Sequence, residues 1–189
     1  PLTALAPLFL LAAALSFVAR PGRRPGRLPF LAEAATLASL SLALAGLAQL
    51  WAGGAQVLPL GDMALLRLDA PSVTMALLVT FVGWVVVRYS RRYLDGEARA
   101  GRFHGLTLAA IAAVLVLVTA ASLPVLVASF AATGLILRQL LLFYPDRAKA
   151  QRAAAKFIRV WGAGDLALIV ASLLLWHSFG TVNIGALTQ

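Results

Sequence analysis

The sequence contains no cysteine, only two histidines and few charges: 12% of its 189 residues are Asp, Glu, Lys or Arg. Without cysteine, the chain can form no disulfide, thiolate site, iron–sulfur cluster or Cys/His zinc site. The scarcity of charge excludes a water-soluble globule, because ordinary soluble domains carry about 25% charged residues. We therefore expect no catalytic site, metal site or cofactor in this chain, and any hard chemistry would belong to a partner.

Apolar residues are abundant instead, making up 61% of the chain, with a mean hydropathy of +0.91. One membrane-spanning helix takes about 20 apolar residues, so this content is enough for five or six spans and leaves little for a soluble domain. The sequence begins at Pro1 inside an apolar run, and we expect it to be part of a longer protein. Short polar segments separate six apolar stretches and predict an all-α polytopic membrane protein with about six transmembrane helices: 2–19, 30–51, 71–87, 105–122, 123–144 and 157–179.

The basic residues divide the connections between these stretches into two kinds. Fifteen of the 16 Lys and Arg residues lie in the segments 20–27, 88–102 and 138–159, and only Arg67 lies elsewhere. The positive-inside rule places such segments in the cytoplasm and both ends of this sequence outside. Topology also accounts for the net charge of +9, so we expect a lipid bilayer as partner and no nucleic acid.

Two of the outer connections have a recognisable form. Segment 53–69 holds two short apolar runs around Gly61 and Asp62, a dipeptide that favours a turn, so we predict a short hairpin on the outer face. Leu123 and Pro124 separate the fourth and fifth stretches. Proline is well tolerated in the first turn of a helix, which predicts a tight connection there.

Asp165 is the clearest charge that topology does not place in water. It is the ninth residue of the last apolar stretch, about 12 Å along the helix, where a carboxylate costs roughly 2.5–3.5 kcal/mol on insertion scales. It must be neutralised by protonation or paired with a cation, which would suit a proton or ion carrier, or it makes a structural hydrogen bond to a neighbouring helix. The preceding Gly162 and Gly164 either break the helix beside it or allow close packing.

Three basic residues also lie within or next to the last two stretches. Arg138 either snorkels to the interface or forms a buried ion pair. Lys156 and Arg159 are one turn apart and share a face. Lys156 is nine residues from Asp165, which places the two on opposite sides of a helix.

The remaining titratable residues near the spans are expected at the interfaces. Glu33 begins the second stretch and is either solvated or paired with an arginine of a connecting loop. His104 opens the fourth stretch, and His177 lies beside Trp176 near the outer end of the last one. His104 is either an interfacial residue, which we favour, or part of a relay, and His177 is most simply a residue of the outer belt.

Four motifs in order resemble the antiporter-like membrane subunits of complex I, the L-subunit or subunit-5 group: segment 66–103, AAAKF at 153–157, GD at 164–165 and GTVN at 180–183. The sequence departs from the complex I pattern at two points. Phe130 and Ala131 stand where that group has a Trp-Glu pair, and Gly162 replaces an Arg before the GD motif. Segment 137–157 instead resembles the membrane subunits of the Dab inorganic carbon systems, which share this ancestry and work with a zinc protein related to β-type carbonic anhydrases.

The resemblance implies a function and a set of path residues. It implies a subunit in a bacterial inner membrane that conducts H⁺ or Na⁺ and couples this flow to CO₂ or bicarbonate capture by a zinc-bearing, DabA-type partner. Lys156 and Asp165 would belong to the polar axis, with Arg138 and Arg159 as additions. The alternatives are a subunit of complex I or of a Mrp-type antiporter, and a structural subunit that conducts nothing. The chain would divide into two helices with the hairpin (1–65), a third helix with a basic loop (66–104), and the start of the antiporter-like repeat (105–189).

Overall fold

A computed structural model describes residues 5–18, 28–61, 63–94, 99–144 and 146–187. Most of the described chain is helical, as predicted, and each predicted span corresponds to one helix. Within the described residues, five helices are long and apolar enough to cross a membrane, and the first is a shorter apolar helix. The elements are α1 Leu5–Val18, α2 Leu28–Gly53, β1 Gln56–Leu60, β2 Met63–Leu68, α3 Ala70–Tyr93, α4 Ala100–Thr119, α5 Leu123–Leu141, α6 Ala148–Phe179 and α7 Ile184–Leu187.

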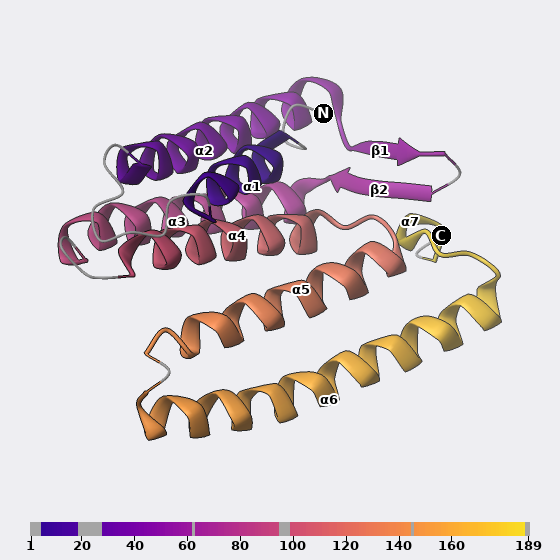
Figure 1. Cartoon of the computed structure of the whole chain (residues 1–189). Helices are drawn as coiled ribbons and strands as arrows, with labels where there is room; N and C mark the ends of the chain where they lie inside the picture. The colour runs from indigo at the N-terminus through magenta and orange to yellow at the C-terminus, as the bar shows by residue number, and fades with distance from the viewer. Residues whose placement is uncertain (1–4, 19–27, 62, 95–98, 145, 188–189) are drawn as a thin grey trace.

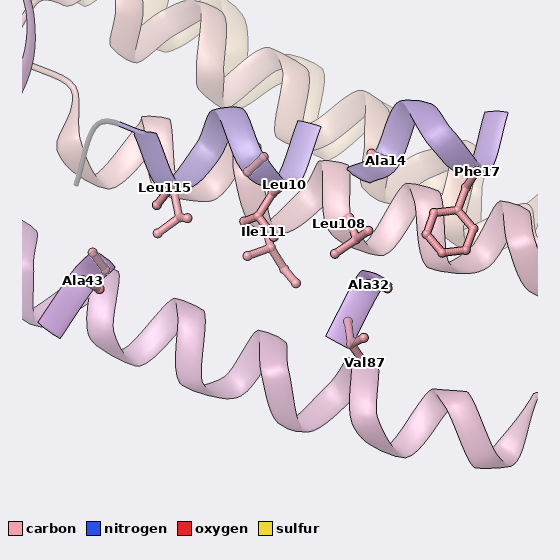
Figure 2. Packing of buried hydrophobic residues seen from close by; sticks show 12 residues of the cluster. Leu10, Ala14, Phe17, Ala32, Ala43, Val87, Leu108, Ile111 and Leu115 are labelled. Atoms are coloured by element: carbon pink, nitrogen blue, oxygen red, sulfur yellow. The ribbon is translucent and has the colours of Figure 1, made fainter. Parts of the chain in front are cut away.

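The first four helices pack into a bundle, and α5 and α6 extend from one side of it (Figure 1). α4 packs against α1, α3 and α5, and α6 packs along α5. The core of the bundle is a cluster of buried aliphatic and aromatic side chains between α1, α2, α3 and α4 (Figure 2). Its largest fully buried members come from three helices: Leu10, Phe17, Val87 and Leu108.

The two ends of the helices differ in chemistry. The carboxyl ends of α3 and α5 and the amino ends of α4 and α6 lie at one end of the molecule, opposite the strands (Figure 1). They carry the arginines and lysines of the second and third basic segments, so we call this the basic end and the other the hairpin end. This arrangement agrees with the predicted sidedness. The first basic segment, 20–27, lies outside the described residues.

The predicted outer hairpin is present. β1 and β2 pair antiparallel, with an irregularity in the register between Leu58 and Pro59. Gly61 has a φ of 60° in the turn, a conformation that favours glycine; Asp62, the second residue of the predicted turn, lies outside the described residues. The chain then enters α3 through a capping box in which Asp69 and Ser72 each bond the other's backbone amide, as this motif does at helix starts.

Three separate segments meet at the hairpin end. The short turn after α4 lies between β2 and the segment that follows α6: the Ala121 amide donates to Leu65 O at 3.2 Å, and the Ile184 amide donates to Ala121 O at 2.9 Å. The Asn183 side chain accepts from the Ala64 amide at 2.9 Å. We call this set of bonds the hairpin-end network. It gives the polar backbone at this end partners within the protein, as buried backbone requires.

The helix bounds differ from the predicted ones mainly at the basic end. α3 continues to Tyr93 and α6 begins at Ala148, so residues assigned to loops by their charge are helical. Arg, Lys, Ala and Gln are strong helix formers, and arginines at a helix carboxyl end interact favourably with its dipole. The start of a charged segment in the sequence therefore does not mark the end of the helix.

Candidate functional site

The contact between α5 and α6 is built around one tryptophan. The Trp161 ring stacks on Phe130 with centroids 4.7 Å apart and on Phe157 at 5.1 Å. Its Nε1 donates to Phe130 O at 3.3 Å. A Cβ added at Gly134 would lie 2.1 Å from that nitrogen, so the indole fits against α5 because this position is glycine.

Asp165 lies one turn beyond Trp161 on α6, and residues four apart on a helix share a face. It is 17 residues after Ala148 and 14 before Phe179, near the middle of this helix. Its side chain is half-buried, and its Oδ1 atom is buried with no hydrogen-bond partner among the described residues. An unpartnered carboxylate oxygen at this depth is a polar group that the described fold does not satisfy.

The two glycines beside Asp165 do neither of the things predicted for them. α6 is continuous from Ala148 to Phe179, so the predicted break is absent. A Cβ at Gly162 would meet nothing within 4 Å, and one at Gly164 would lie 3.8 Å from Phe130, an ordinary contact. The close approach of the two helices occurs at Gly134 instead, because the bulky partner is Trp161, one residue before the glycine pair.

Arg138 lies one turn beyond Gly134 on α5 and therefore faces the same helix contact. Its side chain is half-buried, and its Nε atom is buried without a partner among the described residues. Because α5 and α6 are antiparallel (Figure 1), Arg138 and Asp165 lie on opposite sides of the Trp161 contact, each about 6 Å along its helix. The α5–α6 contact thus carries two incompletely bonded ionisable groups separated by stacked aromatic rings.

Lys156 and Arg159 lie outside this contact. Both side chains are exposed, and the Arg159 Nε donates to the Ala155 carbonyl of its own helix at 3.2 Å. Arg159 is two residues before Trp161, about 200° around the helix, so it faces away from α5. The structure therefore brings Asp165 and Arg138 to one helix interface and leaves the other two predicted residues on the open face of α6.

A second ionisable cluster lies between α2 and α3 near the basic end. The Glu33 side chain is 11% exposed, and its carboxylate accepts from Arg88 Nη1 at 3.1 Å and from Arg91 Nη1. Arg91 also lies over the Phe30 ring, 4.2 Å from its centroid. Of the two alternatives predicted for Glu33, pairing is the correct one. The spacing of the two arginines by three residues, one turn, was the signal that one acidic residue could bind both.

His104 is buried inside the bundle, whereas the sequence favours an interfacial position for it. Only 1% of its surface is exposed, and its ring lies 5.7 Å from Phe17 and 6.1 Å from Phe103 between ring centroids. The reason is that α4 begins at Ala100, which moves residue 104 into the second turn, against α1. His177 is exposed near the hairpin end of α6, as expected for a belt residue.

Among the described residues, no group of three or more His, Asp or Glu side chains could hold a metal ion. The ionisable side chains that the fold buries are single groups or ion pairs.

Comparison with known proteins relates this chain to membrane subunits of complex I and of inorganic carbon transporters. Residues 62–104 match a sequence profile described as the NADH-ubiquinone oxidoreductase (complex I) chain 5 N-terminus. The chain is 33% identical over 138 residues to a probable inorganic carbon transporter subunit DabB2 of Halothiobacillus neapolitanus, covering 71% of this chain and 25% of that protein. It is 34% identical over 124 residues to NADH-quinone oxidoreductase subunit L of Escherichia coli, covering 66% of this chain and 20% of that protein.

A solved structure supports the fold over nearly the whole chain. A subunit of the membrane-bound sulfane sulfur reductase, an archaeal respiratory membrane complex, superposes with a TM-score of 0.81 at 17% identity, covering 96% of this chain and 38% of that one. The chain spans 25% of the length of the DabB2 relative and 20% of the length of subunit L. Over the matched segments it is similar to a family of antiporter-like membrane subunits that includes complex I subunit L and the DabB inorganic carbon transporter subunits.

Proposed function

We propose that this chain is part of a DabB-type membrane subunit that conducts H⁺ or Na⁺ and couples the flow to uptake of CO₂ or bicarbonate. In this proposal a zinc-bearing, carbonic-anhydrase-like subunit of the DabA type supplies the chemistry, and the complex lies in a bacterial inner membrane. The similarity to DabB2 supports this division of labour.

The observation that carries the proposal is the buried, unpartnered carboxylate oxygen of Asp165. Asp165 is the only acidic residue in α5 and α6, and Ala131 has no group that could carry a proton. Intramembrane ionisable residues usually mark ion pathways, because their burial is otherwise unfavourable. Asp165 would take up the cation on one side of the Trp161 contact, and its charge state would change as the cation arrives and leaves.

The other predicted residues take different places in this path. Arg138 would stabilise negative charge on the opposite side of the aromatic contact, toward the basic end. Lys156 and Arg159 lie on the exposed face of α6, so they would line a path only where a further part of the protein covers that face. The proposal therefore ranks Asp165 first and the two exposed cations last in their effect on transport.

Growth in air of cells that lack carbonic anhydrase tests this function. The full-length protein is expressed with its zinc-bearing neighbour, and Asp165→Asn is compared with the matched control Asp146→Asn, an exposed acidic residue before α6. Growth should be lost with Asp165→Asn and kept with Asp146→Asn. Growth supported by this subunit alone, without the zinc protein, would refute the two-component mechanism, and normal growth of Asp165→Asn would favour a structural subunit.

A second candidate is a subunit of complex I or of a Mrp-type cation antiporter. The match of residues 62–104 to the complex I chain 5 profile favours it, whereas Phe130 and Ala131 in place of the Trp-Glu pair do not. The neighbouring genes distinguish the two: a zinc-binding reading frame supports carbon uptake, and a run of oxidoreductase subunits supports complex I.

A further inference from the structure

An apolar groove of about 430 Å³ lies between α1 and α4, toward the basic end. Its walls include Leu11 and Leu15 of α1, and its floor includes Gly105 and Ala109 of α4. Arg102, in the first turn of α4, is the only charged residue that lines it. The groove is thus lined by apolar side chains, with one positively charged residue among them.

The groove exists because α4 has small residues where α1 approaches it. A Cβ added at Gly105 would lie 3.1 Å from Phe17 Cβ and 3.4 Å from Ala14 O. Without that side chain the two helices come close at this point.

The groove opens on a face that the described chain does not cover. Leu8, Leu11 and Leu15 are 59%, 41% and 68% exposed. They are three and four residues apart, which places them on one side of α1. In a membrane protein an apolar helix face of this kind contacts the hydrocarbon of the bilayer or another membrane segment.

The charge of Arg102 indicates what kind of molecule could occupy the groove. Its side chain is exposed, and its Nη2 donates to Gln139 Oε1 at 3.1 Å. That partner is a neutral amide, so it does not compensate the positive charge, and Arg102 forms no ion pair with an acidic residue of the described chain. A guanidinium has five donors and matches the oxygens of a phosphate.

We propose that the groove binds an acyl chain of one anionic phospholipid, whose phosphate pairs with Arg102. The apolar lining of the groove suits part of a hydrocarbon chain, and Arg102 complements a negatively charged headgroup. An apolar protein helix would gain nothing from the uncompensated charge. This lipid site is separate from the α5–α6 contact, and it does not depend on the proposed transport function.

Native mass spectrometry of the full-length protein in its membrane complex tests the site. Binding of phosphatidylglycerol and phosphatidylethanolamine with identical acyl chains is compared for the wild type, Arg102→Gln, Ala109→Phe and the matched control Arg92→Gln. Arg92 is an exposed arginine at the same end, on α3. We expect Arg102→Gln to weaken phosphatidylglycerol binding about five-fold and to leave phosphatidylethanolamine binding unchanged.

The other two variants separate the groove from general attraction of anionic lipid. Ala109→Phe places a ring in the groove and should weaken binding of both lipids, while Arg92→Gln should change neither. Equal binding of the two lipids by the wild type would overturn the proposal. So would equal losses from Arg92→Gln and Arg102→Gln, or a structure of the complex with a protein segment seated in the groove.

Discussion

The bundle of α1 to α4 and the pair α5–α6 bury different fractions of their apolar surface within the described chain. Of the most apolar 18 residues of each helix, 44% are buried in α4 and 6% in α6. The bundle encloses a continuous cluster of side chains from its own four helices, whereas α6 packs along α5 and exposes the rest of its surface. The first region therefore has its own core, and the second presents an apolar face that suits the hydrocarbon of the bilayer or another membrane segment.

The buried carboxylate of Glu33 and the half-buried carboxylate of Asp165 differ in the same way. Glu33, in the bundle, binds two arginines. Asp165, in the α5–α6 pair, has a buried oxygen with no partner in the described chain. A carboxylate with fixed cationic partners holds helices together, whereas one without them can exchange its cation. The comparison teaches that pairing, and not burial alone, separates a structural charge from a candidate ion carrier.

The largest effect on stability is expected from Glu33→Gln. This change leaves Arg88 and Arg91 without a negative partner at a site where the carboxylate is mostly buried. Breaking a buried ion pair costs 3–5 kcal/mol, and we expect about 2–3 kcal/mol because Arg88 is partly exposed. Thermal unfolding of the purified protein measures the loss, with Asp146→Asn as control. Equal melting temperatures for the two variants would remove the distinction between paired and exposed carboxylates.

The next effect tests the packing of the α5–α6 pair. Gly134→Ala places a methyl group 2.1 Å from Trp161 Nε1, and overpacking of this kind costs about 1–3 kcal/mol. The tryptophan should move, which its fluorescence would report. Gly162→Ala is the matched control, because its Cβ meets nothing within 4 Å.

A second change keeps that test specific. If the methyl group acts through Trp161, then Gly134→Ala should have little effect in a Trp161→Leu background. An undiminished loss in that background would show that α5 depends on Gly134 for another reason.

A smaller effect is expected at the hairpin-end network, which connects the two regions. Asn183→Ala removes the acceptor of the Ala64 amide, and one such hydrogen bond contributes about 1 kcal/mol. Hydrogen exchange at Ala64 should become faster while exchange in the middle of α4 stays the same. Unchanged exchange at Ala64 would contradict the bond.

No loss of stability is expected from Asp165→Asn, although it should abolish ion flow. Since Oδ1 has no partner to lose and the substitution removes an unpaired charge from an apolar helix, the free energy of unfolding should stay the same or rise. The same melting measurement as for Glu33→Gln gives the comparison. A loss as large as that of Glu33→Gln would mean that Asp165 has a fixed partner and is a structural charge.

Hydropathy and charge predicted much of the fold. The six helices, the hairpin around Gly61 and the tight turn before Pro124 follow from local composition, because lipid requires helices and short connections. The segment 88–94 was predicted as a loop because its arginines were counted as membrane boundary. Arginine is a good helix former, and Glu33, 55 residues from Arg88 in sequence, pairs with Arg88 and Arg91, so these arginines continue the helix.

The candidate site was predicted in part, for a related reason. The depth of Asp165 could be deduced from its place in an apolar stretch, but its neighbours depend on the register between two helices. One sequence does not determine that register, so the close contact was expected at Gly162 and Gly164 and lies at Gly134. The burial of His104 likewise depends on where α1 packs.

The hairpin-end network also determines when the hairpin can complete its hydrogen bonds during synthesis. The bond between Asn183 and Ala64 joins residues 119 positions apart, so it forms only after α3 to α6 have all been inserted. Domains generally fold from the amino terminus as they are made. The Ala64 amide of the hairpin therefore lacks its Asn183 partner until α6 has been inserted. If insertion stops before α6, the Ala64 amide has no Asn183 side chain to bond. The state of this bond therefore reports whether all the helices have been inserted.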